Sequence, residues 1–413
     1  MKSINTNTPT SKLVIWSTWL VVSIFFAYQY ILRVMPSVIM QDLMLQFDLD
    51  AVLFGQFSGI YYLGYAAAHL PLGILLDRYG TKRVMPICIL LAIIGTLPII
   101  FAKNLVIALC GRLLVGIGSS AAILSAFKVI HSAFGPERFT RILSFTITIG
   151  LVGAMYGGAP LNYLCTAFDF KSIIIVLAVI GLVLAAIAYA VTPEFKAQKT
   201  VSILLNVKEV LSNKMILMVC CFAGLMVGPL EGFADLWGKQ FLQFSYNLDS
   251  NVAAGLSSTL FLGTCFGSPL LSYIAAKINN DTLTIFIAGC VMVLGFVMLL
   301  LGVGNAATLS ITLAIIGGCC TYQTYAIFKA STYISEHAVG LTTSVANMII
   351  MLFGYGFHTT LGMVINSQGG SDSVVALKSG IAIIPIALAL GSAGFLAIYW
   401  NESRKPKLVA EVG

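Results

Sequence analysis

Long apolar runs recur from one end of the sequence to the other, and they constrain the fold more than any other feature. A helix needs roughly 20 apolar residues to cross the hydrocarbon core of a bilayer, and runs of that length follow one another with short polar breaks. Of the 413 residues, 59% are hydrophobic and only 9% are charged, which is unlike an ordinary water-soluble domain. The sequence therefore predicts an all-α polytopic membrane protein, with the lipid bilayer as its surroundings.

The apolar runs divide into twelve expected transmembrane helices. The first run is too long for the core of a signal peptide and has no clear small-residue cleavage site, so we expect it to remain as a span. The expected spans are 14–35, 52–75, 84–101, 105–132, 141–165, 172–192, 214–244, 252–276, 283–303, 307–332, 340–365 and 376–399. An even number of spans places both termini on one side of the membrane.

The distribution of lysine and arginine predicts which side that is. Of the 23 basic residues, only Lys103, Lys171 and Lys378 fall in connectors on the side away from the termini. Because basic residues concentrate in cytoplasmic connectors, we expect both termini in the cytoplasm. The net charge of +7 mostly reflects this asymmetry, so no nucleic-acid partner is expected. Short connectors favour a bacterial inner membrane, with an organellar membrane as the alternative.

The longest polar connector lies near the middle of the chain and divides the spans into two sets of six. We expect a cytoplasmic tail over 1–13, a six-helix bundle over 14–192, a cytoplasmic linker over 193–213, a second six-helix bundle over 214–399 and a cytoplasmic tail over 400–413. Two short echoes support a duplication, since Pro71-Leu72 recurs as Pro269-Leu270 and Phe127-Lys128 recurs as Phe328-Lys329. Two related halves with a central site are one known transporter architecture.

The loop between the second and third spans carries a specific motif. It reads Gly73-Ile-Leu-Leu-Asp77-Arg78-Tyr-Gly80-Thr-Lys82-Arg83. This resembles the signature loop of the major facilitator superfamily, which implies two pseudo-symmetric six-helix bundles and a loop that latches them on the cytoplasmic side. In that arrangement Gly73 would permit close helix contact and Gly80 would turn the chain. Asp77 would meet the positive N-terminal end of a helix from the other half.

Two further stretches refine this resemblance. Gly111-Arg112, followed by Gly116 and Gly118, resembles the superfamily's second motif, an intramembrane arginine followed by glycines. In the fifth span, Gly153 to Pro160 lacks the glycine followed directly by proline that is usual in drug and proton antiporters. This departure favours uptake over multidrug export.

Two carboxyl groups lie well inside a predicted span, the seventh. Glu231 and Asp235 are four residues apart and share one helical face, in a stretch that Pro229 and several glycines weaken. Charged groups within spans tend to face a cavity, so these two are candidates for a proton site or a gate. We expect Arg33, near the outer end of the first span, to pair with one of them as an outer gate. The alternatives are that Arg33 reaches the interface and that Asp235 lies among the headgroups.

Other polar groups within spans are further candidates for the substrate or proton site. Arg112 is expected to face a cavity, and Gln29 and Tyr322 are candidate substrate contacts from polar aromatic clusters. Lys128 and Lys329 occupy matched positions near the cytoplasmic ends of the fourth and tenth spans. There, a functional role and simple extension to the interface are equally consistent with the sequence.

The histidines and cysteines are assigned no special chemistry. His69, His131 and His358 are expected to be packed or hydrogen-bonded, with proton coupling as the alternative. The nine cysteines lie mostly in apolar runs without metal-ligand spacing, so we interpret them as small packing residues. We expect no metal site and no cofactor.

The charges within the spans and the resemblance together favour a secondary transporter. We expect a monomer that works by alternating access and couples protons to uptake of a small polar, ionised or zwitterionic nutrient, such as an amino acid, a short peptide or an organic anion. Neutralising Glu231 or Asp235 would then abolish proton-driven accumulation and leave some exchange. The alternatives are an exporter of a metabolite, siderophore or drug, and a sensor or partner subunit without flux. An enzyme is not expected, because neither an HExxH nor a Gly-x-Ser-x-Gly pattern is present.

Overall fold

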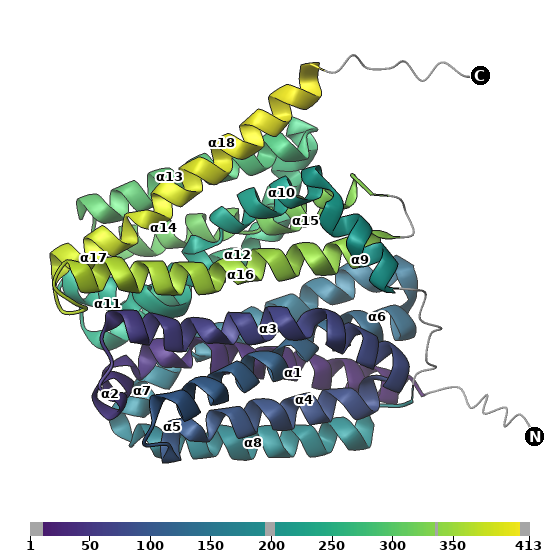
Figure 1. Cartoon of the computed structure of the whole chain (residues 1–413), viewed down its shortest axis with the longest axis horizontal. Coiled ribbons are helices and arrows are strands. Elements are labelled where there is room, and N and C mark those ends of the chain that lie inside the picture. Colours follow the sequence, from purple (N-terminus) through teal and green to yellow (C-terminus); the bar gives the residue numbers. More distant parts are fainter. Residues whose placement is uncertain (1–10, 195–202, 335–337, 405–413) are drawn as a thin grey trace, which may run out of the picture.

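The computed structural model describes residues 11–194, 203–334 and 338–404, and within these ranges the chain forms helices and no strands. Twelve helical segments of the described chain are long and apolar enough to cross a membrane, and each overlaps one expected span. They run side by side along the long axis of the molecule (Figure 1). Parts of the expected tails and linker, namely 1–10, 195–202 and 405–413, lie outside the described residues.

The first six spans are formed by helices α1 to α8. These are α1 (Lys12–Val38), α2 (Met40–Phe47), α3 (Ala51–Tyr79), α4 (Thr81–Thr96), α5 (Pro98–Phe101), α6 (Leu105–Tyr156), α7 (Ala159–Ala167) and α8 (Phe170–Val191). Helix α6 contains the fourth span and most of the fifth. The chain turns between these two spans at Gly135, which has a φ of 72°. Helix α6 packs against α1, α3 and α4, and α8 covers α4.

The second six spans are formed by α10 to α18, with a π-helix, η1, in the seventh. Their bounds are α10 (Lys214–Leu225), η1 (Gly228–Trp237), α11 (Gly238–Ser245), α12 (Ser250–Ile278), α13 (Asp281–Leu301), α14 (Ala306–Cys319), α15 (Tyr322–Ser331), α16 (Val339–Ser367), α17 (Val374–Ile381) and α18 (Ile383–Arg404). Part of the expected linker is itself helical, since α9 (Ile203–Ser212) packs against α10 and α16.

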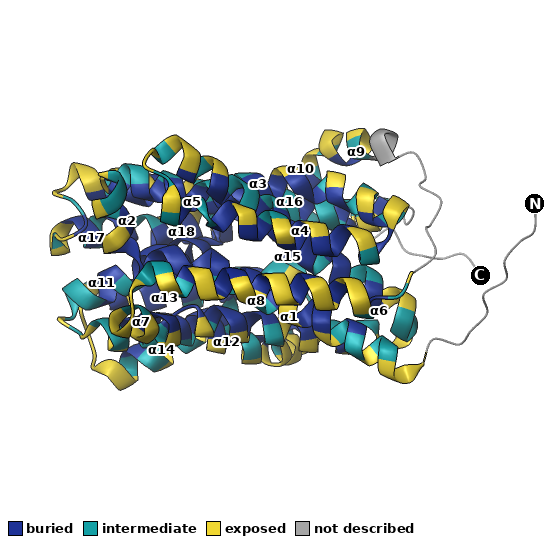
Figure 2. Ribbon diagram, turned by 90° about the horizontal axis from the view of Figure 1, so that it is seen from below, coloured by how far each residue is buried: buried dark blue, intermediate teal, exposed yellow. Residues whose placement is uncertain are grey.

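Exposed residues lie on the outward faces of the helices, whereas buried residues gather inside the bundle (Figure 2). Many of the exposed residues are large and apolar. On α8, for example, Ile175, Val179 and Val183 are exposed, while Leu177 and Leu184 are buried. An exposed apolar face of this kind fits lipid, because helices satisfy their own backbone polar groups and can present hydrocarbon to the bilayer.

The two ends of the bundle differ in what they carry. Helix α1 begins and α18 ends at the same end (Figure 1), which we call the terminal end; the other is the far end. At the terminal end Gly80 joins α3 to α4 with a φ of 79°, so the predicted turn at this glycine is confirmed. The two halves touch where α3 packs against α16 and where α6 packs against α12.

Candidate functional site

A cavity of about 1090 Å³ lies between the two halves. Its walls come from α1, α3 and α6 on one side and from η1, α12, α16 and the junction of α14 and α15 on the other. It extends from Arg33 and Glu231 in the interior to Lys128 and Arg141 near the terminal end. Arg141 is exposed, so the cavity is open toward the terminal end.

The floor of the cavity is an ion-pair cluster that joins the two halves. The Arg33 Nε donates to Asp235 Oδ2 at 2.5 Å, and its Nη2 donates to Glu231 Oε2. The Tyr62 hydroxyl contacts the same two carboxylate oxygens. The Arg33 guanidinium carbon also lies 5.0 Å from the ring centre of Tyr30 and 5.2 Å from that of Tyr62, which adds cation–π attraction. The predicted pairing of Arg33 with a carboxylate is therefore present, with both carboxylates.

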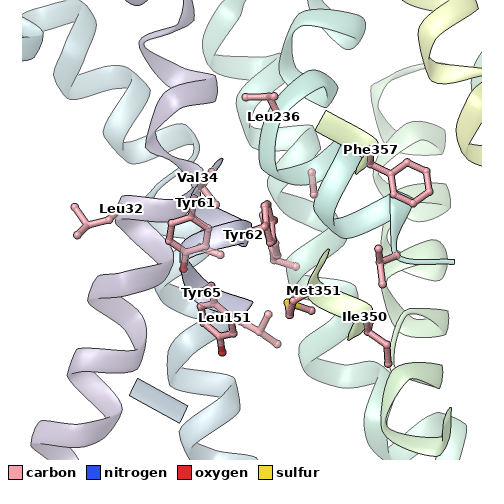
Figure 3. Packing of buried hydrophobic residues seen from close by; sticks show 14 of the residues in the cluster. Leu32, Val34, Tyr61, Tyr62, Tyr65, Leu151, Leu236, Ile350, Met351 and Phe357 are labelled. Atoms are coloured by element: carbon pink, nitrogen blue, oxygen red, sulfur yellow. The ribbon is translucent and has the colours of Figure 1, made fainter. Parts of the chain in front are cut away.

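Helix α3 supplies the aromatic layer next to this cluster. Tyr61, Tyr62 and Tyr65 lie together between the helices of the first half and Met351 of α16 (Figure 3). The Tyr62 ring is 5.2 Å from the ring of His358, whose Nε2 contacts the backbone oxygen of Glu231. The cluster is therefore closely packed on the side of α16.

The seventh span carries both carboxylates on a π-helix. Pro229 stands in the first turn of η1, and Glu231 and Asp235 are both within it. A π-helix bonds each N–H to the fifth preceding carbonyl and is often found at functional sites. We expected this stretch to be a weakened or unwound helix; instead it keeps helical hydrogen bonding with a wider turn. The wide turn still presents both carboxylates to Arg33.

The far end is closed by hydrogen bonds between the halves. The Lys239 Nζ donates to Asn162 Oδ1 at 2.6 Å and to the Val38 oxygen at 3.2 Å. The Asn162 Nδ2 donates to Asn251 Oδ1 at 2.7 Å. A further bond joins Asn366 Nδ2 to Asp50 Oδ2 at 3.2 Å. Together with the ion pairs of Arg33, these contacts separate the cavity from the far end.

The sequence of this chain matches a known family. A model of the Major Facilitator Superfamily matches residues 18–357. The chain belongs to the major facilitator superfamily.

Known transporters are similar to this chain in sequence, and a solved transporter structure shares its fold. The hexuronate transporter of Bacillus subtilis (strain 168) is 24% identical over 170 residues, which are 41% of this chain and 39% of that relative. The uncharacterized transporter YybO of the same strain is 24% identical over 403 residues, covering 86% of this chain and 88% of the relative. A bacterial homologue of the human lysosomal transporter Spinster, in an inward-facing, unoccupied conformation, has a TM-score of 0.73 at 17% identity, covering 96% and 98% of the two chains.

The arginine of the second major facilitator motif supports the backbone and does not line the cavity. Pro36 stands inside α1 and has no N–H, so the oxygen of Leu32, four residues earlier, loses its helical partner. The Arg112 Nη1 donates to that oxygen at 2.6 Å, and its Nη2 donates to the Arg33 oxygen at 2.7 Å. Arg112 therefore fixes the turn of α1 that holds Arg33, and the predicted cavity position is not observed.

This support predicts a specific rescue. Replacing Arg112 with glutamine leaves at least one buried carbonyl without a donor, so we expect a loss of about 1–3 kcal/mol in stability. Pro36→Ala restores the missing N–H, so the double variant should be more stable than Arg112→Gln alone. Thermal unfolding of the four proteins in one detergent measures the coupling. Additive effects of the two changes would contradict this role.

The signature loop of this major facilitator protein makes contacts within the first half. Asp77 Oδ1 accepts from Lys128 Nζ at 2.9 Å, whereas we expected it to meet a helix of the second half. An added Cβ at Gly73 would meet nothing within 4 Å, so the predicted close helix contact is wrong in this conformation. Both differences have one cause, because Gly73, Asp77 and Lys128 line the open cavity that separates the halves here.

The loop has three basic residues that do not line the cavity, Arg78, Lys82 and Arg83. The Arg83 Nη2 is 3.4 Å from Glu194 Oε1 in an exposed ion pair. The Arg78 and Lys82 side chains lie over the rings of Tyr79 and Tyr189.

The tenth span is broken at the depth of the cavity, between α14 and α15. Its predicted substrate contact, Tyr322, is buried and donates to the Ala223 oxygen at 2.7 Å, away from the cavity. The next residue, Gln323, lines the cavity, and its Nε2 is buried without a hydrogen-bond partner. Sequence reasoning missed Gln323, although the same polar cluster contains it. On the facing wall, Gln29 lines the cavity as expected and accepts from the Tyr61 hydroxyl at 2.7 Å.

The remaining candidates lie at various depths. Lys329 bonds Glu402 Oε1 at 2.8 Å and does not line the cavity. His69 lines the cavity, lies 3.0 Å from Ser120 Oγ and stacks on Tyr65. His131 lines the cavity, three residues after Lys128.

Proposed function

We propose that this chain is a proton-coupled transporter that takes up a small polar, ionised or zwitterionic solute by alternating access. The observation that carries the proposal is Arg33, which binds Glu231 and Asp235 of the other half at the closed floor of the cavity. A link of this kind must break before the far end can open. A change in the charge of Arg33, Glu231 or Asp235 therefore shifts the balance between the closed and the open far end.

The membrane orientation follows from the distribution of charge. We assign the terminal end to the cytoplasm, because the connectors there hold most basic residues. The cavity then faces the cytoplasm, and Lys239, Asn162 and Asn251 close the outer side. We place the protein in a bacterial inner membrane, working as a monomer.

Glu231 is the better candidate for the coupling proton. It lines the cavity, so a proton on Glu231 has a route to solution, whereas Asp235 does not line it. The Tyr62 hydroxyl contacts both carboxylates but has one hydrogen to donate, so the second contact is favourable when one carboxyl is protonated. Protonated Glu231 binds Arg33 less strongly, while Asp235 remains its counterion.

The cytoplasmic side needs its own closure in the outward-facing state. We propose that the signature loop supplies it, with Asp77 leaving Lys128 and meeting a helix end of the second half. Gly73, Arg78, Gly80, Lys82 and Arg83 belong to this loop, and the cavity must narrow around Gly73 for it to close.

Two other functions remain candidates. Export of a metabolite, siderophore or drug would use the same cavity with the opposite direction of net flux. A sensor without flux would bind a solute at the same floor. The relative named as a hexuronate transporter favours transport of an organic solute over sensing.

Reconstitution in liposomes tests the proposal. The purified full chain is screened for thermal stabilisation by amino acids, dipeptides, organic acids and sugars, and each hit is tested for uptake with and without an inward proton gradient. We expect gradient-driven accumulation of at least one hit. Binding without flux in either direction would contradict the proposal in favour of a sensor.

A further inference from the structure

We infer that the transported solute is a small hydroxylated monocarboxylate, a sugar-acid type of anion, whose carboxylate replaces Glu231 on Arg33. This inference rests on the proposed function and selects one of its solute classes. It is carried by the sign of charge along the cavity, by the balance of buried charge and by the chemistry of the facing wall.

The cavity wall carries more positive than negative charge. Among the described lining residues the basic side chains are Arg33, Lys128 and Arg141, and the acidic ones are Asp77 and Glu231. All three basic residues come from the first half. Asp77 is bound to Lys128, so Arg141 contributes the net charge near the mouth. An anion is therefore favoured over a cation at the mouth of the cavity.

The buried charges at the floor balance without a solute. Arg33 and Arg112 belong to the first half, Glu231 and Asp235 belong to the second, and each is at most 8% exposed. With all four ionised the net charge is zero, and a proton on Glu231 makes it +1. One monoanion restores neutrality, whereas a zwitterion leaves a net positive charge in a medium where charge is costly. One proton therefore accompanies one monoanion.

The wall opposite the basic residues is suited to hydroxyl groups. The second half contributes uncharged hydrogen-bonding side chains, among them Thr264, Ser268, Gln323, Thr324, Ser344 and Asn347. The Gln323 Nε2 has no partner, so it offers a donor to a solute oxygen. Amide and hydroxyl groups both donate and accept, as sugar hydroxyls do.

Competition for Arg33 then couples release to the proton. While Glu231 is protonated, the solute carboxylate accepts hydrogen bonds from the Nη2 side of the Arg33 guanidinium. When Glu231 gives its proton to the cytoplasmic solution, it becomes an anion already in the cavity wall. It rebinds Arg33 and displaces the solute. The structure has the contacts expected after release, with Glu231 on Nη2 and Asp235 on Nε.

Liposomes containing the full chain test this inference with defined probes. We expect D-gluconate or D-glucuronate to accumulate with an inward proton gradient, at one proton per anion and independently of a potassium diffusion potential. D-glucose, succinate and alanyl-alanine should neither accumulate nor compete. Arg33→Gln should abolish binding of the accumulated sugar acid, whereas Lys103→Gln, which removes an exposed positive charge from a loop, should not.

A second variant separates recognition from folding. Gln323→Leu should raise the KM for the accumulated sugar acid by about three- to ten-fold and leave kcat unchanged, because it removes the Nε2 donor, which has no hydrogen-bond partner within the described protein. Equal stability of this variant and the unmodified chain makes the comparison valid.

Some outcomes would overturn this inference alone. Proton-driven accumulation of alanyl-alanine, without uptake of either sugar acid, would keep the proposed function and exclude an anionic solute. If uptake of the sugar acid depended on the potassium diffusion potential, net charge would cross the membrane in each cycle. That result would contradict the pairing of one proton with one monoanion. Sugar-acid exchange that no proton gradient can drive would instead contradict the proposed coupling and leave the solute class intact.

Discussion

Replacing Glu231 with glutamine should abolish proton-driven accumulation and leave exchange of solute for solute. Glutamine has the size of glutamic acid but cannot bind or release a proton, so each half-cycle proceeds without coupling. For one proton per solute, a pH difference of one unit supports roughly tenfold accumulation, and the variant should fall to simple equilibration. Uptake and counterflow in liposomes, with the pH fixed on each side, measure the two activities.

The matched controls sharpen this result. Glu137→Gln removes an exposed carboxylate near the turn between the fourth and fifth spans and should change neither activity. We also expect Asp235→Asn to keep part of the gradient-driven uptake, because Asp235 does not line the cavity and acts as a fixed counterion. The expectation from sequence was that neutralising either carboxylate would abolish accumulation, whereas the structure assigns this effect to Glu231 alone. Full accumulation by Glu231→Gln would exclude Glu231 as the proton carrier.

The sequence predicted the spans and the central ion pair for clear physical reasons. A bilayer imposes one length on every crossing helix, so the twelve apolar runs determined the twelve helices. Burying an unpaired charge in hydrocarbon is so unfavourable that Arg33, Glu231 and Asp235 had few partners other than one another. Both inferences depend on composition and depth, and a single sequence reports both.

The same sequence could not show which face of a helix a polar residue occupies. Tyr322 and Gln323 are neighbours, yet one bonds the seventh span and the other lines the cavity. Arg112 was expected in the cavity because it is a charge within a span. Its support of the Leu32 oxygen depends on Pro36, which has no N–H to donate to that oxygen. Lys239 was not among the candidates from sequence, although with Asn162 it closes the far end. Such roles depend on helix rotation and on conformation, which hydropathy does not encode.

Replacing Arg33 with glutamine should open the far end. The change removes the cation that holds two carboxylates of the other half, and loss of one partner from a buried ion pair costs about 3–5 kcal/mol. Because the ion pair joins the two halves at the floor of the cavity, opening the far end would break it, and the penalty falls on the closed state. We therefore expect the population with an open far end to rise by about a hundredfold or more, limited by protonation of the freed carboxylates.

Cysteine labelling measures this shift. Ala254 is buried at the far end beside Val38 and Lys239, so Ala254→Cys reports opening there, in a chain whose nine native cysteines have been replaced. An impermeant maleimide added to the far side should label this cysteine much faster when Arg33→Gln is present, whereas Lys103→Gln should leave the rate unchanged. Unchanged labelling in the Arg33 variant would mean that the bonds of Lys239 and Asn162 hold the far end closed without the ion pair. Arg33 would then serve solute binding alone, and the proton on Glu231 would have to act through the solute.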